Sequence, residues 1–130
     1  MIFPAFTVQL PKWVNTFITV SKTVYSSIEE RMELAVELAA QNIKHDGGPF
    51  GAAVFELQTG KLIAPGINLV MQTNCSVVHA EIVAIILAQQ KVASFDLGAE
   101  GLPAYELVTS TEPCAMCLGA IPWSGTSRVV

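Results

Sequence analysis

The chain has 130 residues, which suits one domain, and 52% of them are hydrophobic whereas only 14% are charged. This composition is typical of a globular protein with a large core, and the small share of charged residues predicts self-association. The net charge is -4 and the seven basic residues are scattered, which argues against a nucleic-acid-binding surface.

Residues 1–25 are predicted to form an irregular N-terminal extension, because Pro4 and Pro11 interrupt an otherwise apolar segment. The segment lacks a basic start and carries Lys12, so it matches neither a signal peptide nor a membrane span. Three cysteines are a poor disulfide framework, and two of them form a C-x-x-C motif. We therefore expect a cytoplasmic protein that does not associate with a membrane.

The predicted domain, residues 26–130, begins with a helix. Ser27 and Glu30 have the spacing of a capping box, an apolar face follows, and Gly47 marks the end of the helix. Two strands, Ala52–Leu57 and Leu62–Asn68, are then expected to form a hairpin whose second strand contains a bend or lies at a sheet edge.

The second half of the chain alternates between helices and strands. A helix after His79 is apolar nearly all round, so it is expected to be buried on more than one side. A strand at Tyr105–Thr109 precedes a short helix with Pro113 at its first position, ended by Pro122 and Gly125. The last four residues begin a further strand. This order predicts a mixed sheet with helices on both faces.

Four residues with metal-binding or acid–base chemistry lie at the starts of two predicted helices. His79 and Glu81 begin one helix, and Cys114 and Cys117 begin the other. Three residues apart, the two sulfur atoms face the same way. One imidazole and two thiolates leave the fourth tetrahedral position for water, which is typical of a catalytic zinc site. Glu81 is not needed as a ligand, so we assign it proton transfer.

Simpler interpretations exist for each motif alone. A single histidine at a helix start usually has only a local role, and a single C-x-x-C is often a redox pair or half of a structural site. The combination of H-x-E with P-C-x-x-C, however, is the signature of zinc-dependent nucleobase deaminases. A structural zinc that supports an interaction module is the alternative from a different class of protein.

At "HAE" and "PCAMC" the sequence resembles the cytidine-deaminase-like superfamily, and "DGGPFGAAVFE", "GINLV" and "STEPCAMCLGAIPWSG" resemble bacterial guanine deaminases. The resemblance covers Ser27–Val130. It implies a three-layer αβα sandwich with a mixed central sheet, a homodimer, and hydrolysis of guanine to xanthine and ammonia, with aminated triazines as further candidate substrates. Members usually continue beyond the position of Val130, so the C-terminal part of the fold is expected to be truncated.

The resemblance also implies roles for single residues. It assigns the binding of Zn²⁺ to His79, Cys114 and Cys117, and the proton shuttle to Glu81. It assigns substrate binding to Asn68, whose carboxamide can donate and accept, and to Phe50 as a pocket aromatic. Turn chemistry is the simpler interpretation for Asn68, and core packing for Phe50. Two further candidates for substrate binding are the backbone N–H of Ala80 and Trp123, the latter in the pocket or at the dimer interface.

Deaminases of other substrates stay open as alternatives. A cytosine or cytidine deaminase shares the chemistry, and motif spacing does not exclude it. A tRNA adenosine deaminase shares the core signature but needs a basic surface, which this acidic chain lacks. We therefore expect a small nucleobase as the substrate and no nucleic-acid partner.

Overall fold

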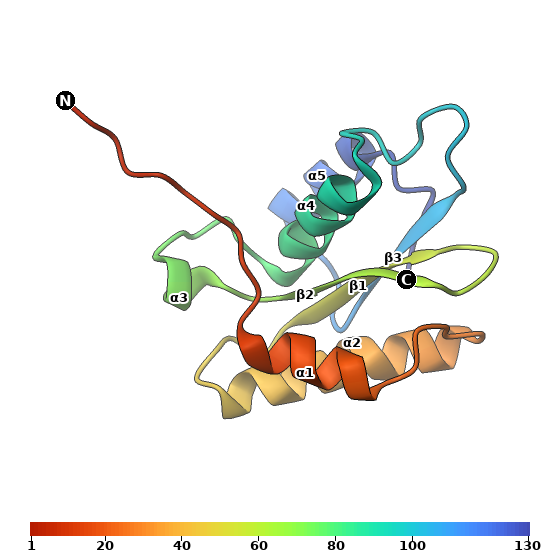
Figure 1. Ribbon diagram of the computed structural model, residues 1–130, viewed down its shortest axis with the longest axis horizontal. Coiled ribbons are helices and arrows are strands. Elements are labelled where there is room, and N and C mark those ends of the chain that lie inside the picture. The colour runs from red at the N-terminus through yellow and green to blue at the C-terminus, as the bar shows by residue number, and fades with distance from the viewer.

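A mixed sheet of four strands forms the centre of the computed structural model, which describes residues 1–130 (Figure 1). The strands lie in the order β2-β1-β3-β4. The hairpin strands β1 (Gly51–Glu56) and β2 (Leu62–Ile67) are antiparallel, and β1 is also antiparallel to β3 (Tyr105–Thr109). The short strand β4 (Arg128–Val129) is parallel to β3, so the predicted mixed sheet is confirmed.

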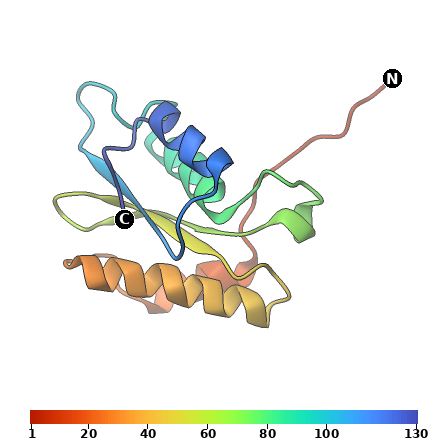
Figure 2. The same ribbon diagram turned by 180° about the vertical axis from the view of Figure 1, so that it is seen from behind.

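Helices cover both faces of this sheet, as Figures 1 and 2 show from opposite sides. On one face lie α1 (Lys12–Val20) and α2 (Ile28–Lys44), and on the other lie α4 (Ala80–Val92) and α5 (Ala115–Ser124). A single turn, α3 (Val70–Thr73), connects β2 to α4. No helix combines the length and the hydrophobicity needed to cross a membrane. The predicted three-layer αβα sandwich is therefore present.

Two glycines let the helix layers approach the hairpin closely. A Cβ atom on Gly51 would lie 2.2 Å from the carbonyl oxygen of Ala35 in α2, and one on Gly66 would lie 2.1 Å from that of Ala80 in α4. Real Cβ atoms do not approach a carbonyl oxygen so closely, so a larger residue would displace the helix. The first turn of α4 is thus held directly against the end of β2.

Sequence signals at the start of the domain behave as predicted. The Ser27 hydroxyl accepts a hydrogen bond from the Glu30 N–H at 3.2 Å, and the Glu30 carboxylate accepts one from the Ser27 N–H at 3.3 Å. This capping box stabilises α2 by about 1 kcal/mol. Strand β2 lies at the edge of the sheet, where Pro65 needs no additional backbone partner.

The N-terminal extension is not irregular throughout, because residues 12–20 form α1. Pro11 is its N-cap and Val14 is fully buried in the core beside α2 residues such as Leu34. Packing stabilises this helix despite a sequence rich in β-branched residues, which have low helix propensity.

Helix α5 ends at Gly125 as predicted, but its start and the place of Pro122 differ from the prediction. Cys114 is the N-cap, so Pro113 precedes the helix instead of being its first residue. Pro122 lies inside the helix, and Gly125, with φ of 78°, ends it. Pro122 has no N–H group to donate to the carbonyl of Leu118, so this helix lacks one of its regular hydrogen bonds.

An ion-pair network around the buried Glu106 connects α2 to β3 and β4. Glu106 in β3 is fully buried and accepts hydrogen bonds from Arg31 in α2 and Arg128 in β4. Loss of one partner of a buried pair costs about 3–5 kcal/mol, because the other charge stays buried. Both carboxylate oxygens of Glu106 accept hydrogen bonds from arginine, so we infer that this network stabilises the fold and does not bind a ligand.

Candidate metal and substrate site

Two helix N-termini bring the predicted metal ligands together. His79 is the N-cap of α4, Cys114 is the N-cap of α5, and Cys117 lies one turn further along α5. The His79 Nδ1 atom lies 3.6 Å from the Sγ atom of Cys114 and 3.7 Å from that of Cys117. One ligand atom from each residue lies within 4.8 Å of the other two, so all three can reach a single ion.

The two thiols have different electrostatic environments. Hydrogen bonds from the backbone N–H groups of Cys117 and then Met116 lower the pKa of the exposed Cys114 thiol. Burial, followed by the nearby Glu81 carboxylate, raises the pKa of the Cys117 thiol. A buried thiolate beside a carboxylate needs a cation, and one nitrogen and two sulfur ligands fit Zn²⁺.

Glu81 lies beside these ligands without belonging to the group. It is the second residue of α4 and is only 4% exposed. Its Oε1 atom accepts a hydrogen bond from the Thr109 hydroxyl at 3.3 Å, and its Oε2 atom accepts one from the Cys117 thiol at 3.5 Å. The carboxylate is therefore anchored at the end of β3 and directed toward the ligands, as a proton-transferring group must be.

A cavity of about 130 Å³ opens beside the ligands. Asn68 enters it from the end of β2 and is 8% exposed, and Phe50 enters it from the residue before β1. The Asn68 Oδ1 atom accepts a hydrogen bond from the Val70 N–H at 3.2 Å, which leaves the NH₂ group free to donate. The lining residues are Phe50, Asn68, His79, Glu81, Thr111, Glu112 and Cys114.

Comparison with known proteins agrees with this site. Residues 25–130 match the family model of the cytidine and deoxycytidylate deaminase zinc-binding region. The chain belongs to this deaminase family. The family predicted from the H-x-E and P-C-x-x-C motifs is thereby confirmed, and these motifs contain the three residues that could hold a metal ion, together with Glu81.

Several deaminases are similar to the chain over most of its length. The guanine deaminase of Bacillus subtilis is 42% identical over 102 residues, which cover 78% of this chain and 61% of that protein. A tRNA-specific adenosine deaminase of Agrobacterium fabrum is 35% identical, over 75% of this chain and 60% of that protein. The chain therefore spans about three fifths of the curated relatives it matches.

A solved structure of guanine deaminase from Nitrosomonas europaea has the same fold. It superposes with a TM-score of 0.90 at 46% identity, over 99% of this chain and 70% of that one. The predicted cytidine-deaminase-like sandwich is confirmed by this match.

Two residues predicted to bind substrate do not line the cavity beside the candidate metal ligands. Ala80 is fully buried, and only its backbone N–H, a first-turn donor without an intrahelical acceptor, is relevant to a ligand. Trp123 lies near the C-terminal end of α5 and is 88% exposed, so the structure does not bring it to the cavity of its own chain. The reason is that α5 starts at the metal ligands and runs away from them.

Three residues near the deaminase site were not predicted. Thr109 holds Glu81, and Thr111 and Glu112 line the cavity. Thr111 and Glu112 are polar residues between the buried strand β3 and Cys114, a position that could have indicated proximity to the candidate metal ligands. Thr109 is the last residue of β3 itself and gave no such signal.

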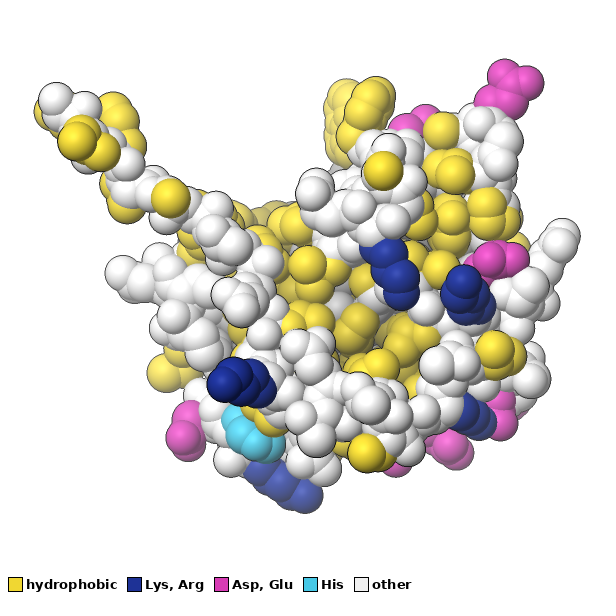
Figure 3. Space-filling view, in the orientation of Figure 1, with side chains coloured by type: hydrophobic (Ala, Val, Ile, Leu, Met, Phe, Trp, Pro, Cys, Tyr) yellow, Lys and Arg dark blue, Asp and Glu magenta, His cyan; other side chains and the backbone are white.

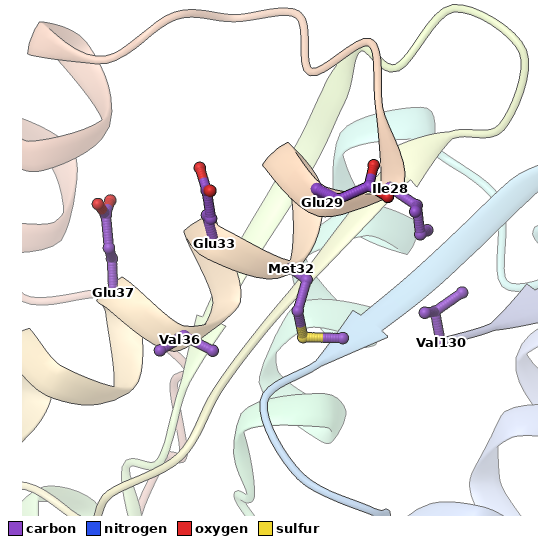
Figure 4. Close-up of a pocket in the computed structure, with 7 residues that line it drawn as sticks. All are labelled: Ile28, Glu29, Met32, Glu33, Val36, Glu37 and Val130. Carbon is purple, nitrogen blue, oxygen red and sulfur yellow. The ribbon is translucent and has the colours of Figure 1, made fainter.

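A larger cavity, of about 520 Å³, lies elsewhere, along α2 (Figure 4). Apolar side chains from α2, including Met32 and Val36, line it together with Val130, and three glutamates of α2 border it. None of its lining residues is a histidine or a cysteine, so the smaller cavity is the candidate active site.

Proposed function

We propose that this chain is a zinc-dependent deaminase of a free nucleobase, and that it hydrolyses guanine to xanthine and ammonia. The observation that carries the proposal is the meeting of His79, Cys114 and Cys117 with Glu81 at one small cavity. Guanine as the substrate rests on the similarity to the guanine deaminases of Bacillus and Nitrosomonas.

The reaction needs water to replace the amino group of the base. His79, Cys114 and Cys117 would hold the zinc ion, which when bound would act as a Lewis acid and lower the pKa of the attacking water toward about 7. Glu81 accepts a proton from that water and delivers it to a ring nitrogen, while the water oxygen bonds to the amino-bearing carbon. Glu81 then transfers the second proton to the amino group, the C–N bond breaks, and ammonia leaves.

The cavity favours a free base over larger substrates. Its volume of about 130 Å³ lies below the roughly 300–1,000 Å³ of pockets for drug-sized ligands. The NH₂ group of Asn68 is available to a carbonyl oxygen of the base, and Phe50 offers an aromatic surface against its ring. On the face shown in Figure 3, basic side chains stand apart from one another among hydrophobic, uncharged and acidic ones. This arrangement differs from the basic surface that a tRNA substrate favours.

Ammonia release tests the proposal directly. Zinc-loaded protein is incubated with guanine, guanosine, cytosine, cytidine, adenine, an aminated triazine and tRNA, and guanine is expected to react fastest. Faster release from cytosine or cytidine would establish the cytosine-type alternative, and faster release from tRNA the adenosine-type one. Protein that holds zinc but releases no ammonia from any of them would support a structural zinc in an interaction module.

Asn68→Ala is expected to lower kcat/KM for guanine by roughly ten- to a hundredfold without loss of zinc. The substitution leaves a polar group of the bound base unpaired, which costs about 1–3 kcal/mol. Steady-state kinetics and metal analysis measure the two effects. Asn15→Ala, at an exposed position of α1, is the control and should match the unsubstituted chain. Unchanged kinetics in Asn68→Ala would remove Asn68 from the proposed pocket.

We also propose that the chain forms a homodimer through the outer face of α5. This helix buries few of its side chains, and Met116, Leu118 and Trp123 are exposed on it, the last at 88%. An apolar helix surface of this kind is stabilised by a second copy. Sedimentation analysis should therefore show a dimer for the unsubstituted chain and a monomer for Trp123→Glu. Monomers in both cases would refute the dimer.

A further inference from the structure

We infer that Asn42 is a positioning residue that sets the affinity for the base by holding both substrate-facing side chains in place. The inference rests on the proposed function. Asn42 lies in the last turn of α2, is fully buried and does not line the cavity. Its Nδ2 atom donates to the carbonyl oxygen of Gly48 at 2.9 Å and to that of Asn68 at 3.0 Å. One carboxamide thus ties the segment before β1 to the segment after β2.

The hydrogen bonds continue from these carbonyl groups to Phe50. The Phe50 N–H donates to the same Gly48 carbonyl oxygen at 2.8 Å, and the Asn68 N–H donates to the Phe50 carbonyl oxygen at 3.3 Å. The backbones of both substrate-facing residues therefore belong to one short network that Asn42 organises from behind the cavity.

The glycines of this segment fit the same arrangement. A Cβ atom on Gly47 would lie 2.5 Å from the Cγ atom of Asn42, and one on Gly48 would lie 3.0 Å from the Cγ atom of Asn68. A side chain at position 47 would therefore displace the Asn42 carboxamide, and one at position 48 would crowd that of Asn68.

The Asn42 carboxamide acts through its NH₂ group and not through its carbonyl oxygen. Its Oδ1 atom is buried and has no hydrogen-bond partner, whereas both N–H groups are used. Such an unpaired buried oxygen costs stability. Asn42→Asp keeps the shape but places an acceptor against two carbonyl oxygens, so the network should open.

Asn42→Asp is expected to raise KM for guanine about tenfold and to alter kcat far less. The reason is the loss of one or both hydrogen bonds that position Asn68 and the segment before Phe50. The metal ligands and Glu81 are held by α4, α5 and β3 and make no hydrogen bond to Asn42. Zinc content should therefore stay at the unsubstituted level. A merely structural role would lower the melting temperature without this division between KM and kcat.

The experiment combines three variants with two measurements. Asn42→Asp, Asn68→Ala and the double variant are compared by guanine kinetics. Their affinity for 8-azaguanine is measured by calorimetry with Glu81→Gln added to each variant, so that the base is bound without being turned over. If Asn42 acts through Asn68, the double variant loses less than the two single losses combined. Leu34→Ala is the control, since Leu34 is buried in α2 but distant from the network, and it should lower the melting temperature without changing KM. Asn42→Ser carries the same prediction and replaces Asn42→Asp if that variant does not fold.

Weaker 8-azaguanine binding in Asn42→Asp supports the inference even if guanine is not turned over, in which case only the proposed reaction fails. Equal affinities in Asn42→Asp and the unsubstituted chain would overturn it. So would full additivity in the double variant, or an equal rise of KM in Leu34→Ala.

Discussion

Glu81→Gln is expected to reduce kcat for deamination by about 10²–10⁴-fold while the protein keeps its zinc and its fold. Glutamine has nearly the shape of glutamate and can still contact the Thr109 hydroxyl. It cannot accept the proton of water and pass it on, however, and the reaction needs this transfer twice. The loss should therefore fall on kcat, with KM for guanine little changed.

Three measurements separate this role from a structural one. Metal analysis and thermal unfolding should give the same values for Glu81→Gln as for the unsubstituted chain, and only turnover should differ. Glu37→Gln is the control, because Glu37 lies on α2 and does not line the candidate active site. It removes one negative charge and should leave turnover unchanged. Rapid deamination by zinc-loaded Glu81→Gln would show that another group transfers the protons.

The meeting of His79, Cys114 and Cys117 could be predicted because the residues of each motif lie at a short, fixed spacing along the chain. His79 and Glu81 are separated by a single residue, and Cys114 and Cys117 are one helical turn apart. Each pair lies at the N-terminus of a helix, and the two helices, α4 and α5, begin at the same end of the sheet. The 3.6 Å approach of His79 to Cys114 follows from this arrangement.

The positioning residues could not be predicted in this way, because tertiary contacts alone define their roles. Nothing in the periodicity of α2 separates Asn42 from another polar residue near a helix end, and its partners Gly48 and Asn68 belong to different segments. Thr109 continues a fully buried strand and contacts Glu81 only because α4 crosses β3 there.

Helix α1 was missed for a related reason. Its sequence has weak helix propensity and no side-chain cap, and its stability comes from residues such as Val14 that pack against the core. Where local signals are strong, as at the capping box of Ser27 and Glu30, the helix start agrees with the prediction.

Cys114→Ser is expected to lower the zinc content from about one ion per chain to nearly none, and to abolish turnover with it. Serine is a better N-cap than cysteine, so α5 should keep its start and the variant should fold. Its hydroxyl does not ionise near neutral pH as a metal-bound thiol does, so one of three protein ligands is lost. The resulting fall in affinity should exceed the roughly 10–100-fold typical of changes outside the ligand set.

Cys75→Ser provides the matched control, because Cys75 is the one cysteine outside the ligand group. It should retain one zinc ion and its activity, whereas Cys114→Ser loses both under the same dialysis against a weak chelator. Undiminished zinc in Cys114→Ser would place the ion elsewhere and remove the basis of the proposed reaction. Equal loss in the two variants would indicate a general effect of thiol removal, and only a loss confined to Cys114→Ser fits an ion held by His79, Cys114 and Cys117.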